Sequence, residues 1–187
     1  YPPSVRGGVG VNSLSLGKDT FGFVCHPLAD KNRDHIKLFN RYGGLLREIK
    51  VEELKPPYVV ATGDFYNDNK GDEIAVASRY APGKISIYSV QGKRVLKTSA
   101  PVNKKSTDGY HLAVIKKNDT SDQLVYQDVT AQKLYSFDGK STLTAYNGDY
   151  TLPGKARVFN SVYPQKKMNA GEKQDVVSTV YSITKDG

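Results

Sequence analysis

Short runs of apolar and β-branched residues, many of them alternating with polar positions, recur along the chain and are separated by turn residues. Between residues 58 and 99 the runs are YVVAT, EIAVAS, KISIYSV and KRVLKTS, joined by GDFYNDNKG, RYAPG and QG. A period of two with turns rich in Gly, Asn, Asp and Pro is typical of short antiparallel strands. Only residues 45–55, LLREIKVEELK, resemble a helix, and their position after a Gly-Gly turn favours a strand that runs into a loop. The pattern predicts an all-β protein.

The strand pattern repeats about every fifty residues. An Asp directly before an apolar strand occurs four times, at steps of 53, 50 and 53 residues: Asp19, Asp72, Asp122 and Asp175. A second marker, an aromatic residue ahead of a Gly turn, occurs at Phe39, Tyr88 and Tyr135. Four-stranded repeats of this length are typical of β-propeller blades. The sequence therefore predicts a β-propeller with four-stranded antiparallel blades at about 8–54, 57–100, 109–150 and 155–187, the last incomplete.

The number of predicted strands is too small for a closed propeller, which requires at least four complete blades. The chain holds three nearly complete units and stops after the second strand of a fourth. We therefore expect it to be part of a longer propeller chain that supplies the remaining blades, or to obtain the missing strands from elsewhere. A β-sandwich, which is also built from short strands with regularly spaced turns, is the alternative fold.

Composition and charge narrow the class of protein. The chain has 187 residues, of which 38% are hydrophobic and 25% charged, as in an ordinary globular domain. No apolar stretch is long enough for a transmembrane helix. A single cysteine, Cys25, excludes an internal disulfide framework and any multi-cysteine metal site. The net charge of +8 predicts attraction to anionic surfaces or polymers.

Two lysine pairs are candidates for binding such a polymer. Lys116–Lys117 and Lys166–Lys167 are 50 residues apart, so they take equivalent positions in the repeat, just before an inter-strand loop. Equivalent loops of a propeller lie on one face, and we therefore expect a basic rim that could bind an acidic polysaccharide. A solvated set of loops is the alternative. Nucleic acid is not predicted, because the sequence has no aromatic–basic stacking motif and no recognition helix.

The stretch GDFYNDNKGDEIAV at 63–76 carries the clearest candidate chemistry. Asp64, Asp68 and Asp72 stand at every fourth position, ahead of an apolar strand. Calcium prefers six to eight oxygen ligands, among them carboxylates and backbone carbonyls. An EF-hand is excluded, because Ala75 stands where that loop requires a bidentate Glu. The competing interpretation is a solvated turn between two strands.

The same stretch resembles the FG-GAP/VCBS repeat of integrin-like β-propellers. This resemblance implies that the Asp64, Asp68 and Asp72 carboxylates and the Lys70 carbonyl hold a structural calcium ion between the first two strands of a blade. Tyr66 replaces the usual Asp or Asn, and Asn69 replaces the usual Gly, so we expect weaker binding, an added water or a contribution from Asn67. The complete motif occurs once.

The resemblance also implies a function. We expect a calcium-stabilised binding or scaffold module that is secreted, periplasmic or at the cell surface and recognises a protein or a carbohydrate. The alternative is a propeller-type polysaccharide lyase or glycoside hydrolase, or a non-catalytic domain of one. The sequence contains no convincing acid–base pair, so an enzyme is the second interpretation.

Overall fold

The computed structural model describes residues 8–28, 33–66, 68, 70–100, 107, 109–115, 121–131, 133–137 and 143–145. Within these ranges the chain forms β-strands joined by turns and loops, and it contains no helix. The all-β prediction is confirmed. The predicted unit at 155–187 lies outside the described residues.

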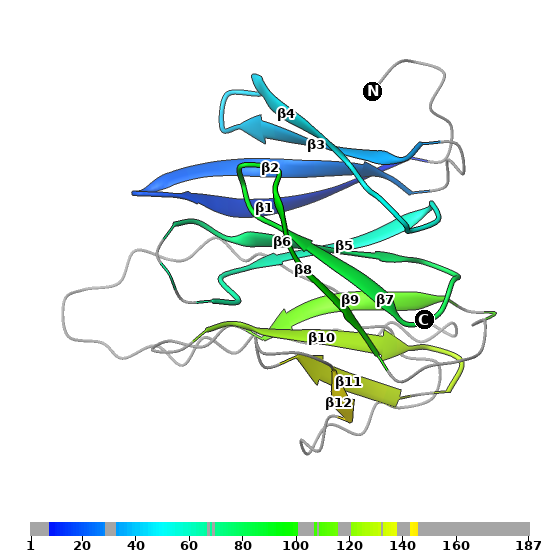
Figure 1. Cartoon of the computed structure of the whole chain (residues 1–187). Helices are drawn as coiled ribbons and strands as arrows, with labels where there is room; N and C mark the ends of the chain where they lie inside the picture. The colour runs from blue at the N-terminus through cyan, green and yellow to red at the C-terminus, as the bar shows by residue number, and fades with distance from the viewer. Residues whose placement is uncertain are drawn as a thin grey trace, which may run out of the picture.

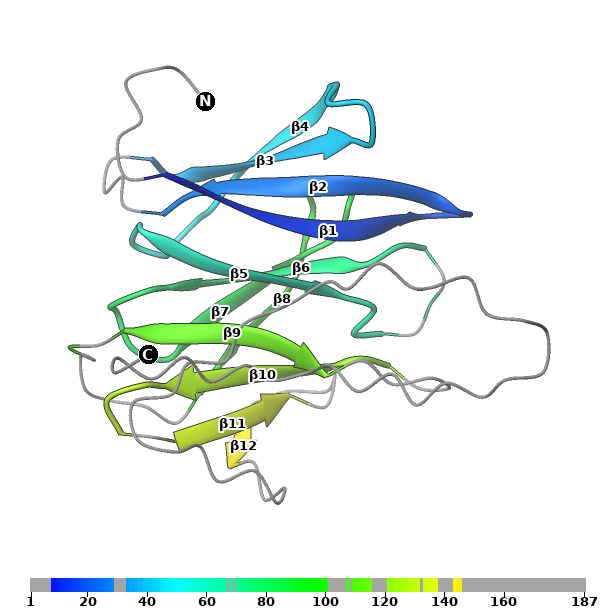
Figure 2. The same ribbon diagram turned by 180° about the vertical axis from the view of Figure 1, so that it is seen from behind.

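The strands form three separate four-stranded sheets, and in each sheet every strand is antiparallel to the next one in the chain. Sheet 1 contains β1 (Val9–Gly17), β2 (Thr20–Pro27), β3 (His35–Asn40) and β4 (Leu45–Lys50). Sheet 2 contains β5 (Tyr58–Gly63), β6 (Glu73–Ser78), β7 (Lys84–Tyr88) and β8 (Arg94–Ser99). Sheet 3 contains β9 (Tyr110–Ile115), β10 (Gln123–Asp128), β11 (Lys133–Phe137) and β12 (Thr144–Ala145). The sheets are stacked in chain order, with sheet 2 in the middle (Figures 1 and 2).

Both faces of sheet 2 are buried, and this explains the apolar character of its strands. Successive side chains of a strand point to opposite faces of the sheet. Tyr58 and Val60 accordingly join an apolar core with sheet 1, whereas Val59 and Ala61 join a second core with sheet 3. Every residue of β6 is buried, so this strand has no solvent-facing side on which polar residues could alternate. The two cores lie between sheets 1 and 2 and between sheets 2 and 3.

Small residues let the first two sheets approach closely at one end. The β1–β2 turn is a two-residue turn whose residues Lys18 and Asp19 both have positive φ, as type I′ hairpins require. Gly71 in the β5–β6 loop has φ +112°, and a Cβ there would lie 3.0 Å from the carbonyl oxygen of Ser15. Backbone therefore meets backbone where the β1–β2 turn and the β5–β6 loop are in contact.

Tyr126 links sheet 3 to the turn between β6 and β7. Its hydroxyl accepts a hydrogen bond of 3.2 Å from the buried backbone N–H of Gly83, and its ring stacks on Tyr110 with centroids 5.1 Å apart. Replacing Tyr126 by Phe leaves the Gly83 N–H without this acceptor, and we expect the free energy of unfolding to fall by about 1 kcal/mol in urea denaturation. The control is Tyr80→Phe, at an exposed tyrosine. Equal effects of the two substitutions would contradict the prediction.

Candidate metal site

The acidic stretch forms the loop between β5 and β6. Asp64 directly follows β5, and Asp72 directly precedes β6. Asn67 and Asn69 lie outside the described residues, as do Lys116, Lys117, Lys166 and Lys167, so the predicted Asn67 contribution and the predicted basic rim stay predictions. The described part of the loop contains all three predicted carboxylates and Lys70.

Three carboxylates converge in this loop, and one of them was not predicted. One oxygen each from Asp64, Asp68 and Glu73 lie within 4.8 Å of one another. Glu73 is the first residue of β6 and is buried, Asp64 is half-buried, and Asp68 sits at the surface. The sequence placed Glu73 one residue beyond the predicted ligand set. The structure therefore offers a compact group of acidic oxygens at the start of the strand.

The group is electrostatically uncompensated at its buried end. The Oδ1 atom of Asp64 is buried and has no hydrogen-bond partner among the described residues. Burial, together with the negative charges of Asp64, Asp68 and Asp72, raises the pKa of Glu73 to about 7, although the N–H of Phe65 donates to Glu73 Oε2 at 2.8 Å. A buried acceptor without a donor and a carboxylate that resists ionisation both indicate a place that favours positive charge.

Asp68 lies at the surface, and its negative charge is partly balanced by Lys70. The backbone N–H of Lys70 donates to its Oδ1 at 3.0 Å, which lowers the pKa of Asp68, and the Lys70 ammonium lies 3.1 Å from its Oδ2. Such an exposed ion pair contributes little energy and can open without large cost. The Asp68 carboxylate can therefore exchange the lysine for another cation.

These residues fit a calcium ion. Calcium accepts carboxylate, carbonyl and water oxygens in flexible numbers, and Asp64, Asp68 and Glu73 would supply three carboxylates. The unpartnered oxygen of Asp64 is the kind of atom that a bound cation would satisfy. The carbonyl of Lys70 faces sheet 1, because a Cβ on Gly17 would lie 3.2 Å from it. Its role as a ligand stays a prediction.

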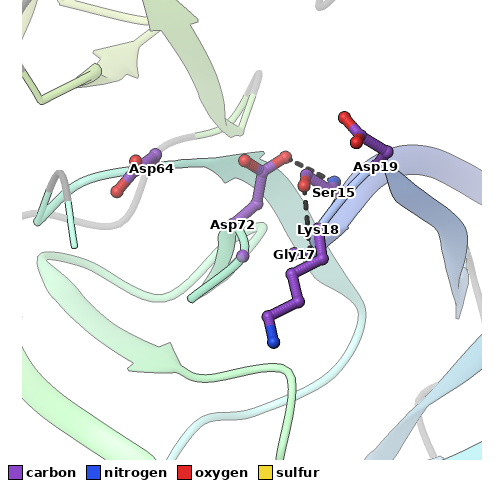
Figure 3. Close-up of a pocket in the computed structure, with 7 residues that line it drawn as sticks. Ser15, Gly17, Lys18, Asp19, Asp64 and Asp72 are labelled. Atoms are coloured by element: carbon purple, nitrogen blue, oxygen red, sulfur yellow. Dashed lines mark hydrogen bonds between the residues drawn. The ribbon is translucent and has the colours of Figure 1, made fainter. Parts of the chain in front are cut away.

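Asp72 has a different set of contacts from the other two predicted aspartates. Its Oδ2 accepts a hydrogen bond of 2.9 Å from the backbone N–H of Ser15 in β1, and its own N–H donates to the carbonyl of Ser15 at 2.8 Å. This reciprocal pair joins sheet 2 to sheet 1. Figure 3 shows the hydrogen bond from the Ser15 N–H to Asp72. In this view Asp64 and Ser15 lie on different sides of Asp72. Asp72 is not part of the Asp64–Asp68–Glu73 group among the described residues.

The same reciprocal pair recurs between sheets 2 and 3. The N–H of Asp122 donates to the carbonyl of Asp64 at 2.7 Å, and Asp122 Oδ2 accepts from the N–H of Asp64 at 2.9 Å. Asp72 and Asp122 are two of the aspartates that mark the repeat, and each directly precedes the second strand of its sheet. We call this arrangement the inter-sheet aspartate pair. It ties the backbone of Asp64 to sheet 3 while the Asp64 side chain stays available to a cation.

An open pocket of about 400 Å³ lies where the β1–β2 turn meets the β5–β6 loop. Its walls come from both sheets (Figure 3), and they are Ser15, Gly17, Lys18, Asp19, Asp64, Gly71 and Asp72. Asp64 belongs both to this pocket and to the acidic group. The acidic group therefore lies beside the place where the loops of neighbouring sheets meet.

Comparison with known proteins assigns no family. No family model matches the chain, and no curated protein matches its sequence. The resemblance to FG-GAP/VCBS repeats therefore stays a prediction from the residues of one loop. In the part of the chain that the structure describes, no helix is long and apolar enough to span a membrane.

Proposed function

We propose that the chain is a calcium-stabilised binding or scaffold module of the β-propeller type, secreted, periplasmic or at the cell surface, whose ligand is a protein or a carbohydrate. One observation carries the proposal: oxygens of Asp64, Asp68 and Glu73 lie within 4.8 Å of one another, and Oδ1 of Asp64 is buried without a hydrogen-bond partner among the described residues. The resemblance of the loop to FG-GAP/VCBS repeats supports calcium as the cation.

The position of the loop supports a structural role for the ion. Asp64 is bound through its backbone to Asp122 of sheet 3, and Asp72 at the other end of the loop is bound to Ser15 of sheet 1. A cation on Asp64 and Glu73 would hold together both ends of a loop that touches all three sheets. It would also offset the repulsion among the neighbouring carboxylates. We infer that the ion fixes the relative positions of the sheets that carry the binding surface.

The arrangement of the sheets supports the propeller. Three four-stranded sheets of consecutive antiparallel strands follow one another in the chain and stack in the same order (Figure 1). They fall within the predicted blades 8–54, 57–100 and 109–150. A propeller has at least four blades, so further sheets have to join the stack to complete one.

Thermal melting with calcium and with chelator tests the proposed ion. At a calcium concentration about ten times Kd, binding to the folded state stabilises by about 1.4 kcal/mol, which raises Tm by about 3–6 °C. We expect this shift in the wild type and its loss in Asp68→Ala, because the truncation removes one of the three carboxylates from an exposed position.

The control is Asp34→Ala, which removes another exposed aspartate that pairs with His35. It should lower Tm slightly and keep the calcium shift. A wild type whose Tm is the same in calcium and in chelator would refute the cation site.

A further inference from the structure

The outer face of sheet 1 carries large apolar side chains that are exposed. Sheet 1 lies at one end of the stack (Figures 1 and 2). On the strand β2, Phe21 is 57% exposed and Phe23 is 38% exposed, and on the neighbouring strand Val11 is 60% exposed. These residues share one face, because Val11 pairs with Cys25 and Ser13 with Phe23 in the antiparallel register. Several large apolar side chains exposed on one face of a soluble protein can mark an interaction site.

The equivalent positions of the other two sheets are completely buried. Phe21 and Phe23 are the second and fourth residues after Asp19. The second and fourth residues after Asp72 and Asp122 are Ile74, Val76, Leu124 and Tyr126, and each is 0% exposed. Ile74 and Val76 belong to the core shared with sheet 1, and Leu124 and Tyr126 belong to the core shared with sheet 2. In both cases the preceding sheet covers this face, so sheet 1 carries the pattern of a face that another sheet covers.

Asp19 matches this pattern in its position along the chain. Asp72 and Asp122 each form the inter-sheet aspartate pair with the preceding sheet. Asp19 has the same place, directly before the second strand of its sheet, and it is exposed, at the wall of the pocket that the β1–β2 turn shares with the β5–β6 loop. A sheet that covered Phe21 and Phe23 would bring a backbone N–H and carbonyl to Asp19 in the way that Ser15 meets Asp72.

We propose that the outer face of sheet 1, defined by Val11, Phe21 and Phe23 with Asp19 at its edge, packs against a sheet of a second copy of this chain. The structure shows twice that a sheet of this chain can cover such a face: sheet 1 covers sheet 2, and sheet 2 covers sheet 3. The described chain leaves the stack from β12 in sheet 3, and sheet 2 separates that end from sheet 1 (Figure 1). A sheet from another molecule reaches the outer face without crossing the stack.

The contact joins two different surfaces, because in both examples the equivalent face of sheet 2 or sheet 3 is covered by the opposite face of the preceding sheet. Such head-to-tail contacts produce rings when the rotation closes and open chains when it does not. A ring would complete the number of sheets that a propeller needs. The contact does not involve the Asp64–Asp68–Glu73 group, so it is independent of the cation.

Sedimentation velocity of the full 187-residue chain over a range of concentrations tests the proposal. We expect species larger than the monomer whose fraction increases with concentration. Phe21→Lys should shift them to the monomer, because it places a charge in the centre of the contact. Asp19→Gly, which suits the positive φ at that position, should raise the apparent Kd about tenfold. The control is Val95→Lys, which adds the same charge at an exposed valine of β8 and should leave the assembly unchanged.

Photocrosslinking identifies the surface that covers the face. With p-benzoylphenylalanine in place of Phe21, we expect crosslinks between two copies of the chain. A monomeric wild type at all concentrations, or equal effects of Phe21→Lys and Val95→Lys, would overturn the proposal. Crosslinks within one copy to residues 146–187 would also overturn it, because the chain would then cover its own face. Persistence of the assembly in Asp68→Ala separates this contact from the cation site.

Discussion

Replacement of Asp122 by alanine is expected to lower the free energy of unfolding by about 3 kcal/mol. Asp122 is 8% exposed, and its carboxylate accepts a hydrogen bond of 2.9 Å from the N–H of Asp64. Hydrogen bonds to charged groups contribute about 1.5–3 kcal/mol, and the substitution also leaves the Asp64 N–H without its side-chain acceptor. The contact joins sheets 2 and 3, so its loss weakens their packing. Urea denaturation with a comparison of m-values measures the effect.

Asp122→Asn and Asp34→Ala serve as controls for this prediction. Asparagine keeps an oxygen that can accept from Asp64 N–H but loses the charge, and we expect about half of the alanine effect. Asp34 is exposed and pairs with His35 at the surface, so its replacement should change the free energy of unfolding much less than Asp122→Ala does. A loss below about 1 kcal/mol in Asp122→Ala would show that the inter-sheet aspartate pair does not hold the sheets together.

The repeat marker was visible in the sequence, but its physical role was not. Spacing alone identifies an Asp before each second strand. Its contact depends on Ser15 and Asp64, which lie 57 and 58 residues from their partners Asp72 and Asp122. A contact over such a distance requires the stacking of the sheets, which a pattern of local turns and strands does not contain. The structure gives the marker a role as a connection between sheets.

The strands themselves could be predicted because their cause is local. The runs between residues 58 and 99 coincide with β5 to β8 to within two residues at each end. Alternation, turn residues and β-branched side chains are properties of adjacent positions. The burial of β6 on both faces was not predicted, because it depends on the sheets that lie on either side.

The alignment of the aromatic residues shows the limit of spacing. Phe39 pairs with Phe23, and Tyr135 pairs with Tyr126, so both face the fourth residue after the repeat's Asp. Tyr88 instead pairs with Ile74, the second residue after Asp72. Because the turns between the strands differ in length, aromatic residues at similar spacing along the chain do not all pair with equivalent residues.

The composition of the acidic group was predicted in part for a similar reason. Asp64 and Asp68 were predicted as ligands from the loop pattern, and the structure brings oxygens of their carboxylates together. Asp72 and Glu73 are neighbours where the strand begins, so their side chains point in opposite directions. Asp72 turns towards Ser15, which leaves Glu73 to join Asp64 and Asp68. Which of two adjacent acids enters the group depends on the neighbouring sheet.

Replacement of Glu73 by glutamine is expected to stabilise the calcium-free protein at neutral and alkaline pH. Burial raises the pKa of Glu73 from 4.5 to about 7. A carboxyl whose pKa is raised on folding contributes its full stability below pH 4.5, and this contribution is lost as the pH rises through 7. After a discount for solvent screening, the loss is about 2 kcal/mol at pH 8. Glutamine is neutral and keeps an oxygen for the N–H of Phe65, so in chelator at pH 8 the variant should exceed the wild type by about that amount.

The sign of this difference should reverse in calcium, and the reversal distinguishes a cation site from a merely buried acid. A bound cation stabilises the ionised form of Glu73, so in saturating calcium at pH 8 the wild type should be the more stable protein. At pH 4.5 in chelator the two should agree within about 0.5 kcal/mol, because Glu73 is then protonated in the folded state. Urea denaturation of both proteins at pH 4.5 and 8, with calcium and with chelator, measures all four differences. A variant that stays more stable than the wild type in calcium would show that Glu73 does not bind the ion, since only a ligand carboxylate gains from its own charge.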